Sequence, residues 1–409
     1  MIELLDLPPS LHTALLAAAQ QQPSALVGGA VRDLLLHHRH RDPWRGLPDL
    51  DLVVEGSASH WVDALRRALP PGSGCSAREH GAFGTVELEL TLPQGPDCSW
   101  LLDVATARRE TYAEPAHNPS VVPGSLLDDL ARRDFSVNAM ALDLVSGQLL
   151  DPHGGQRDLE QRELRFLHAR SLSDDPTRLF RAARYAARLQ FGLAAESQAQ
   201  VEAALQAWPW PWRHGDDPAA APPALSTRLR MELQLLLERE PWHEALSTLQ
   251  HWGALLLLDP ALQRAVPWRS LHWGQRLGVS PLLILVAAAD DPLALASRLQ
   301  LPHRDQRCLQ RWLELRCAYP PPQATADWPA SRWCHWLEAA GDGPDAVVLA
   351  IVMGLQPRRP LLRWLLRWRQ VRSPISAGEL MQREGLRPGP ALGNRLRQLR
   401  AEQLDQELP

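Results

Sequence analysis

The chain has 409 residues, a formal net charge of −4 and five cysteines. This length predicts roughly two to four domains rather than a single core. The longest apolar runs are too short to cross a membrane, and the amino terminus has acidic residues where a secretory signal would have basic ones. We therefore expect a cytoplasmic protein without a membrane partner. The odd number of cysteines, without C-x-x-C spacing, argues against a disulfide framework and against a zinc site.

The positive charge is carried by arginine alone. The sequence contains no lysine, so all 43 basic residues are arginines, and many of them lie between Arg157 and Arg188. The mutational bias of a GC-rich genome would explain the absence of lysine, but it would not explain the clustering. Because the planar guanidinium group binds phosphates and base edges in bidentate fashion, the cluster indicates a polyanionic partner.

The pattern of apolar residues changes near residue 150. Before it, short β-type runs alternate with helical runs, which is typical of an α/β domain. The helical runs are Ser10–Gln20, Val31–His37 and His60–Ala68, and the β-type runs are Leu50–Val54, Thr85–Leu92, Trp100–Ala105 and Ser136–Leu144. After residues 151–155 the apolar residues recur at helical spacing to the end. We therefore predict an α+β protein, with an amino-terminal mixed sheet and helices followed by an all-helical remainder. The Pro- and Trp-rich residues 208–223 are predicted to form a loop.

Two glycines stand between an apolar run and a helical run. Gly28 and Gly29 precede Val31–His37, which predicts a strand, a turn and a helix. Glycines at such a turn let backbone N–H groups approach a triphosphate, and the start of the helix favours anions. Arg32, one turn into the helix and followed by Asp33, would reach a phosphate. A plain turn without a ligand has the same local pattern.

Three aspartates are candidates for a metal site. Asp49 and Asp51 are separated by one residue, so on a strand both carboxylates point to the same face, where a hard cation can use them. Asp103 ends an apolar run and could lie on an adjacent strand. Three converging carboxylates would repel one another unless a divalent ion lay among them, and magnesium with a nucleoside triphosphate is the usual solution. The alternative for Asp103 is a strand-end residue that pairs with Arg108.

A basic pair precedes the last β-type run. Arg132, Arg133 and Asp134 come directly before a run that contains Asn138, so we expect them at the edge of a strand. An arginine pair near the metal site would neutralise the triphosphate and bind the ribose. The alternative is a solvated corner held by salt bridges.

The fourth segment carries acidic and basic residues at a spacing of three. Asp175, Arg178, Arg181 and Arg184 are predicted to project from one face of a helix that Asp174 could cap. An aspartate can accept from the exocyclic amine of cytosine or adenine while an arginine donates to the ring acceptor beside it, so uracil and guanine would be rejected. The alternative is an ordinary salt bridge on a surface helix.

In their order and spacing these segments resemble the class II tRNA nucleotidyltransferases, which comprise the CCA-adding enzymes and their bacterial poly(A) polymerase relatives. The resemblance covers almost the whole chain. It includes G-G-A-V-R-D at 28–33, D-L-D at 49–51, H-G-A-F-G-T at 80–85, D-V-A-T-A-R at 103–108, R-R-D-F-S-V-N-A-M-A at 132–141, D-P-H-G-G at 151–155, D-D-P-T-R at 174–178, S-T-R-L-R-M-E-L at 226–233 and G-L-R-P-G-P-A-L-G at 385–393.

The resemblance implies a nucleotidyltransferase head over residues 1–150, a helical neck over 151–240, a helical body over 241–320 and a helical tail over 321–409. It implies that Asp49 and Asp51 bind Mg²⁺, that Gly29 and Arg32 lie at the triphosphate, and that an arginine of the 132–133 pair lies at the nucleotide. Asp175 and Arg178 match the family's amino-acid template for the base, with Arg181 and Arg184 in support.

The activity that the resemblance implies is the transfer of CMP and AMP from CTP and ATP to the 3′ end of tRNA, which the body and tail would bind. The oligomeric state is left open. Residues 110–123 form a loop that is shortened in CC-adding members and full length here, which favours an enzyme able to add the terminal adenosine. An enzyme that adds only A, or a poly(A) polymerase, remains an alternative within the family.

The sequence departs from the family pattern in three places. The stretch His37–Pro48 is longer than expected and is predicted to be a solvated loop rather than a histidine metal site. Asp174 replaces a glutamate, and Thr227 replaces an acid before Arg228. A non-catalytic RNA-binding relative would lack a carboxylate of the D-x-D pair or a template residue, and neither is missing. A dinucleotide oxidoreductase would need G-x-G-x-x-G, which Gly28-Gly29-Ala30-Val31-Arg32 does not provide.

Overall fold

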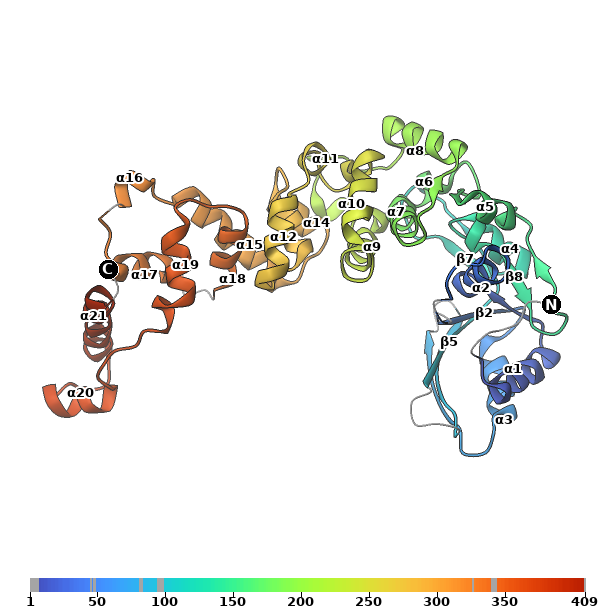
Figure 1. Cartoon of the computed structure of the whole chain (residues 1–409), viewed down its shortest axis with the longest axis horizontal. Helices are drawn as coiled ribbons and strands as arrows, with labels where there is room; N and C mark the ends of the chain where they lie inside the picture. Colours follow the sequence, from blue (N-terminus) through green and yellow to red (C-terminus); the bar gives the residue numbers. More distant parts are fainter. Residues whose placement is uncertain are drawn as a thin grey trace. The chain divides into compact units, whose positions relative to one another are not determined.

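The computed structural model describes residues 7–44, 46, 49–80, 84–93, 99–325, 327–339 and 344–407. The chain divides into two compact units, Met1–Asp216 with Ala220–Ala254 and Asp217–Ala219 with Leu255–Pro409 (Figure 1). The first unit holds the segments predicted as head and neck, except residues 217–219, together with residues 241–254, and the second holds the rest. The finer division into four domains stays a prediction. Among the described residues, no helix is long and apolar enough to cross a membrane.

The head is built on a seven-stranded mixed sheet with the order β3-β4-β5-β2-β1-β8-β9. Its strands are β1 (Ser24–Val27), β2 (Leu50–Val54), β3 (Gly74–His80), β4 (Thr85–Thr91), β5 (Ser99–Thr106), β8 (Ala141–Asp143) and β9 (Leu149–Leu150). β2 and β5 are parallel, and the other neighbouring pairs of this sheet are antiparallel. The alternating polarity of β4 buries every second residue, which gives this side of the sheet one face against the core.

The three helices that the sequence predicted for the head begin and end close to the predicted positions. They are α1 (Pro9–Gln21), α2 (Gly29–His40) and α3 (Ala58–Ala68). The fully buried Trp61 of α3 donates its indole N–H to Ser24 Oγ of β1 at 3.0 Å, so even the polar atom of this large side chain is paired in the core. The middle of the H-G-A-F-G-T segment, residues 81–83, and residues 45, 47 and 48 of the predicted loop lie outside the described residues.

The predicted strand Ser136–Leu144 is wrong in its first half. Residues Ser136–Asn138 form a 3₁₀ turn, η1, and only Ala141–Asp143 joins the sheet as β8. The cause is tertiary: the Ser136 N–H donates to the carbonyl of Arg165, and its hydroxyl donates to the buried carboxylate of Asp158. These bonds prevent the segment from pairing with the sheet as an extended strand. Before this turn, α4 (Leu126–Ala131) ends at Arg132, so the arginine pair follows a helix and not a strand edge.

The first unit continues as helices, as predicted. Strands β6 (Arg108–Thr111) and β7 (Ser120–Pro123) form a hairpin outside the main sheet. The helices after the head are α5 (Gly155–Gln161), α6 (Ser171–Asp174), α7 (Arg178–Leu189), α8 (Ala195–Ala207), α9 (Thr227–Arg239) and α10 (Trp242–His251). The exception is a two-residue parallel pair, β10 (Glu163–Leu164) with β11 (Gly192–Leu193). Residues 208–226 form a loop with two short 3₁₀ turns, η2 (Pro218–Ala220) and η3 (Pro223–Leu225), in agreement with the prediction.

The second unit is helical over its described residues. Its helices are α11 (Pro260–Arg264), α12 (Trp268–Leu277), α13 (Pro281–Ala287), α14 (Pro292–Arg298), α15 (His303–Ala318), α16 (Pro322–Thr325), α17 (Ala330–Glu338), α18 (Asp345–Val352), α19 (Arg358–Leu366), α20 (Ala377–Glu384) and α21 (Pro390–Glu407). Arg298, buried in this unit, donates to the carbonyl groups of Leu257 and Leu258 at 3.0 and 2.5 Å. A buried charge is therefore paired with backbone acceptors at the end of the 3₁₀ turn η4 (Ala254–Leu257).

Candidate active site

A cavity of about 710 Å³ in the first unit brings most of the predicted site residues together. Its walls come from the β1–α2 turn, strands β2 and β5, the β6–β7 hairpin, the segment after α4, helix α7 and the start of α9. The predicted residues that line it are Gly28, Gly29, Asp51, Asp103, Arg132, Arg133, Asp134, Asn138, Asp175, Arg178 and Arg181. Of the other predicted residues, Asp49, Arg32, Asp33 and Arg184 do not line this cavity.

The glycine turn leaves space beside a carboxylate. Gly28 has φ +71°, a conformation that L side chains rarely adopt, and it begins α2. A Cβ at this position would lie 3.2 Å from Asp51 Oδ2 and 3.1 Å from Arg133 Nη1. The bare backbone therefore lets one acidic and one basic side chain approach the start of a helix, where the N–H groups favour an anion.

Asp51 and Asp103 lie on neighbouring strands, as predicted, whereas Asp49 precedes the strand on which it was expected. Asp51 of β2 is directly opposite Asp103 of β5, so both side chains lie on the same face of the sheet. Burial raises the pKa of Asp51 to about 6; the guanidinium of Arg133 opposes this rise, and the carboxylates of Asp103 and Asp49 add to it. Burial raises the pKa of Asp103 too, together with Glu87 and Asp49. Arg108, the partner of Asp103 in the alternative reading, pairs with Glu110 at 3.0 Å.

Asp49 is exposed at the bend that precedes β2, and it acts on both other aspartates through charge. Among the described residues, no group of three acidic, histidine or cysteine side chains is arranged as a formed metal site. The donor set nevertheless fits a hard cation, because the charge of Asp49 raises the pKa of Asp51 and of Asp103, and a divalent ion relieves this repulsion. The fit rests on three oxygen donors next to a glycine turn that keeps the space beside Asp51 open.

The arginine pair is held by an acid that the sequence analysis missed. Asp129 of α4 is fully buried; its Oδ1 accepts from Arg132 at 2.7 and 2.9 Å and its Oδ2 accepts from Arg133 at 3.0 Å. One carboxylate thus orients both guanidinium groups, which lie three and four residues further along the chain. The spacing D-x-x-R-R was visible in the sequence and is typical of ion pairs one helical turn apart.

Arg32 lies elsewhere than expected. Its side chain is only 2% exposed, and it donates to Asn138 Oδ1 at 2.8 Å and to Asp33 Oδ1 at 2.8 Å. Its guanidinium also lies over the ring of Tyr185, 5.1 Å from the ring centroid. In this structure Arg32 therefore holds Asn138 and Tyr185, which line the cavity, and does not reach into the cavity itself.

Asp175 is not on the helix that carries the arginines. It follows α6 in an extended conformation, and α7 begins at Arg178, so the prediction of one continuous helical face is wrong. The physical reason is local: Asp175 Oδ1 accepts from the backbone N–H and the hydroxyl of Thr177 at 3.0 and 2.6 Å, a turn that competes with helix. Asp174 does not cap α7 either, because its carboxylate pairs with Arg170.

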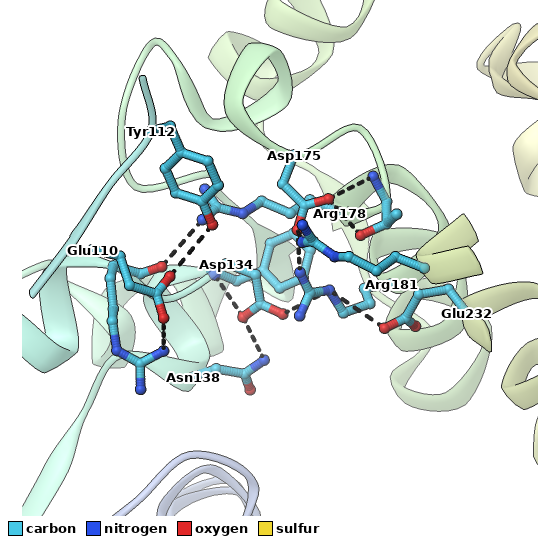
Figure 2. Close-up of polar contacts among 12 residues, drawn as sticks. Glu110, Tyr112, Asp134, Asn138, Asp175, Arg178, Arg181 and Glu232 are labelled. Carbon is cyan, nitrogen blue, oxygen red and sulfur yellow. Dashed lines mark hydrogen bonds and ion pairs between the residues drawn. The ribbon is translucent and has the colours of Figure 1, made fainter. Parts of the chain in front are cut away.

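The turn nevertheless places Asp175 against the predicted arginines (Figure 2). Asp175 is 1% exposed, and its Oδ2 accepts from Arg181 at 3.1 Å and from Arg228 of α9. Burial alone would raise the pKa of Asp175, but the charges of Arg181, Arg228 and Arg178 outweigh it and hold the pKa below its ordinary value. Asp175 is therefore a carboxylate at neutral pH.

The arginines of α7 have different surroundings. Arg178 is 3% exposed and donates from Nη2 to the carbonyl of Arg132 at 3.1 Å, while its Nε has no hydrogen-bond partner. The Nε of Arg181 also lacks a hydrogen-bond acceptor, although Asp134 and Glu232 lie 3.7 and 3.8 Å away. Buried donors without acceptors are unfavourable, so both positions favour a ligand with acceptor atoms. Arg184 follows them on α7, does not line the cavity, and pairs with Glu232 at 2.6 Å.

Several residues of the cavity were missed by the sequence analysis. Tyr112 donates its hydroxyl to Glu110 Oε2 at 3.3 Å, and the other oxygen of Glu110 accepts from Arg132 at 3.1 Å, so the β6–β7 hairpin forms a wall opposite Asp175 (Figure 2). Arg228 and Tyr185 also line the cavity. Tyr185 directly follows Arg184 on α7, and Arg228 lies within the segment S-T-R-L-R-M-E-L at 226–233, so both stand in segments that the sequence singled out. No spacing in the sequence links Glu110 and Tyr112 of the hairpin to these segments.

Comparisons with known proteins agree with this geometry. A family model described as the poly A polymerase head domain matches residues 24–165. The chain is 42% identical over 294 residues to a CC-adding tRNA nucleotidyltransferase of Deinococcus radiodurans, which covers 71% of this chain and 70% of that protein. It is 33% identical over 284 residues to an A-adding tRNA nucleotidyltransferase of Aquifex aeolicus, over 65% of this chain and 31% of that protein. An apo CCA-adding enzyme shares the fold, with a TM-score of 0.69 at 24% identity over 98% of this chain and 94% of that one.

The fold and the cavity define a nucleotidyltransferase, with carboxylates on a sheet next to a glycine turn and arginines on the facing helix. The chain belongs to the family of tRNA nucleotidyltransferases that share the poly A polymerase head domain. The family suggested by the sequence motifs is thereby confirmed, as is the α+β fold class.

Proposed function

We propose that this enzyme transfers CMP and AMP from CTP and ATP to the 3′-hydroxyl of tRNA and so builds or repairs the CCA terminus. The observation that carries the proposal is that a single cavity is lined by Asp51 and Asp103 on one side and by Asp175 and Arg178 on the other. The first pair suits chemistry at phosphates, and the second suits recognition of a base edge. An enzyme that selects nucleotides without a template strand needs both in one place.

The carboxylates Asp49, Asp51 and Asp103 are the residues that would hold Mg²⁺. Magnesium bound there with a triphosphate would neutralise phosphate charge and lower the pKa of the attacking 3′-hydroxyl. The protein's own contribution is to orient the triphosphate: Gly28 and Gly29 expose backbone N–H groups at the start of α2, and Arg132 and Arg133, fixed by Asp129, supply positive charge beside them.

Base selection would be the task of Asp175 and Arg178. An ionised Asp175 accepts from the exocyclic amine that cytosine and adenine share, and the guanidinium of Arg178 donates to the adjacent ring nitrogen. A carboxylate has about four acceptor positions, and in this structure Thr177, Arg181 and Arg228 occupy those of Asp175. A bound base would therefore replace one of the two arginines at Oδ2. Uracil and guanine offer a carbonyl and a ring N–H instead, so they would leave donors and acceptors unpaired.

The second unit offers surfaces for tRNA. On α12 the exposed Trp273 has its ring centroid 5.6 Å from the guanidinium of Arg276. Three further exposed arginines lie on α19, at 359 and 363, and directly after it, at 367. Exposed arginine and aromatic side chains suit the phosphates and bases of RNA. Solved CCA-adding enzymes of similar fold include complexes with CTP, ATP and tRNA, at 23–24% identity and TM-scores of 0.63–0.68. Since tRNA is the substrate that we propose, we expect the reaction to take place in the cytoplasm.

A second candidate function is the addition of the two cytidines alone. The relative in Deinococcus radiodurans that is 42% identical to this chain is a CC-adding enzyme. Against this candidate stands the full length that the resemblance to the family implies for the loop between β6 and β7. The Ala116 N–H of this loop donates to the carbonyl groups of Ser173 and Asp174 at 3.2 Å, so the loop reaches the base-reading segment. This contact favours an enzyme that can also add adenosine.

One experiment separates these possibilities. Purified protein is incubated with Mg²⁺ and three tRNAs that end before the CCA, after the first C and after CC, each with one labelled nucleoside triphosphate. We expect CMP on the first two substrates, AMP on the third, and termination after the adenosine. Labelling of the first two substrates alone would assign CC addition, labelling of the third alone would assign A addition, and a long ladder of AMP would assign a poly(A) polymerase. No incorporation with any substrate would refute the proposal.

The metal ligands are tested separately. The Asp49→Ala enzyme should not incorporate nucleotides and should bind tRNA nearly as the wild type does, measured by gel shift. The control is Asp63→Ala, which removes an exposed acid of the same domain that pairs with Arg66 on α3. Normal turnover of the Asp49→Ala enzyme would overturn the assignment of this carboxylate.

A further inference from the structure

Helix α6 has a single turn and directly precedes Asp175. So short a helix is not stable by itself, and the carbonyl groups of its last turn need partners outside it. In this structure Ser171 O accepts from Asp175 N–H at 3.1 Å, and the carbonyl groups of Ser173 and Asp174 share the Ala116 N–H of the β6–β7 loop at 3.2 Å. The Leu172 carbonyl accepts from the indole Nε1 of Trp210 at 3.1 Å.

Trp210 belongs to the W-P-W-P-W segment after α8, and this segment packs upon itself. Trp208 turns out of α8 with φ +47° and donates its indole N–H to the carbonyl of Trp212 at 2.6 Å. The rings of Trp208 and Trp210 lie edge to face, 5.1 Å apart, and His214 contacts the rings of Trp208 and Trp212. The prolines between the tryptophans fix φ and lower the freedom of the unfolded segment. Trp210 is 3% exposed.

The segment before Asp175 is thus held from two sides. On one side lies Ala116, fully buried with φ +60°, whose carbonyl also accepts from Ala224 N–H of η3 at 3.1 Å. On the other side lies the indole of Trp210. All of these residues belong to the first unit, and α6 and α8 are neighbours in Figure 1. Because α6 has one turn, a shift of the Leu172 carbonyl moves the backbone that carries Asp175.

We infer that Trp210 is a positioning residue for base selection: its indole N–H holds the Leu172 carbonyl and thereby sets the place of the Asp175 carboxylate relative to Arg178. This inference rests on the proposed role of Asp175 in reading the base. Trp210 does not line the active-site cavity, so it acts on the base-reading site through the backbone of α6 and not by contact with the nucleotide.

The test compares Trp210→Phe with Trp208→Phe. Both changes remove an indole N–H and keep an aromatic ring in the same packed segment, but only the change at 210 leaves a carbonyl of α6 without its donor. The measurement is kcat/KM for CTP and ATP against UTP and GTP on tRNA ending before the CCA and after CC, with kcat and KM resolved separately. Thermal unfolding of both variants serves as the measure of stability.

For Trp210→Phe we expect the preference for the correct nucleotides to fall by about fivefold, the effect of one lost hydrogen bond, while Trp208→Phe keeps the wild-type preference. A Trp210→Phe enzyme that unfolds at a lower temperature but selects nucleotides as the wild type does would show a purely structural role and overturn the inference. An equal loss of preference in both variants would overturn it as well. If the wild-type enzyme incorporated no nucleotide, the proposed function itself would fail, so the two failures are distinguishable.

Discussion

Asp175→Asn offers the sharpest test of the base-reading site. The carboxylate is 1% exposed, with Thr177 on Oδ1 and the guanidinium groups of Arg181 and Arg228 on Oδ2. In the variant the amide oxygen would stay with Thr177, because the backbone N–H there requires an acceptor. The amide nitrogen would then face the arginines and any bound base, where it can donate but cannot accept.

Two magnitudes follow from this geometry. A base contact of this kind discriminates by about 1–3 kcal/mol, so the ratio of kcat/KM for CTP over UTP should fall roughly 10- to 100-fold. The amide can donate to the O4 carbonyl of uracil, so UTP should gain while CTP loses. Removing one partner of a fully buried ion pair costs about 3–5 kcal/mol. Arg181 and Arg228 keep 29% and 28% of their side chains exposed, so we expect a loss in unfolding free energy of about 2 kcal/mol.

The assay is incorporation of each labelled nucleotide into tRNA ending before the CCA, together with urea unfolding of the same preparations. Asp174→Asn is the matched control, because the neighbouring carboxylate pairs with the largely exposed Arg170. It should keep the nucleotide preference and lose less than about 1 kcal/mol. A folded Asp175→Asn enzyme with the wild-type preference would refute the template role, as would an equal shift in the control.

Three further predictions test other parts of the site. Gly28→Ala and Gly278→Ala both place a side chain on a backbone with positive φ, so each should lower stability by about 1 kcal/mol. Only Gly28→Ala should lose nucleotide transfer, because a Cβ at Gly278 meets nothing within 4 Å. Equal activities of the two variants would contradict the role of the glycine turn. Asp129→Ala should lower the unfolding free energy by about 3 kcal/mol and raise KM for CTP, since both arginines of the pair lose their acceptor; a wild-type KM would argue against it. The difference in unfolding free energy between wild type and Asp175→Asn should stay constant from pH 5 to 8, because the lowered pKa keeps the Asp175 carboxylate ionised. Below about pH 4 the difference should shrink as this carboxylate protonates. A decline already at pH 6 in urea titrations would contradict the lowered pKa.

Local pattern was enough for much of the fold. The spacing of apolar residues located the helices at 9–21, 29–40 and 58–68 and the strand Leu50–Val54, because helix and strand periods are properties of neighbouring residues. The prolines and tryptophans at 208–223 identified the loop for the same reason. The strands of the β6–β7 hairpin were missed, since their residues show little alternation and are mostly exposed.

Hydrogen bonds to specific partners overruled the expected pattern at two places, by a tertiary contact at Ser136 and by a local one at Asp175. The β-type residues from Ser136 form a 3₁₀ turn because Arg165 and Asp158 bind Ser136, and both lie in a later segment. Asp175 leaves the helical register because Thr177 satisfies its carboxylate in a turn. In each case a hydrogen bond to a specific partner outweighed a weak local preference. The partners of Ser136 lie more than twenty residues away and cannot be read from spacing, whereas the D-x-T spacing of Asp175 and Thr177 was visible in the sequence.

By itself the sequence determined the family, the order of the motifs and the residue types of the site, because these depend on chemistry carried by short segments. Only the tertiary structure decided that Arg32 is buried against Tyr185 and that Arg228 reaches Asp175 from a helix some fifty residues away. The physical reason is that charges are paired and desolvated by whichever side chains the fold brings within a few ångströms, and distance along the chain says nothing about that proximity.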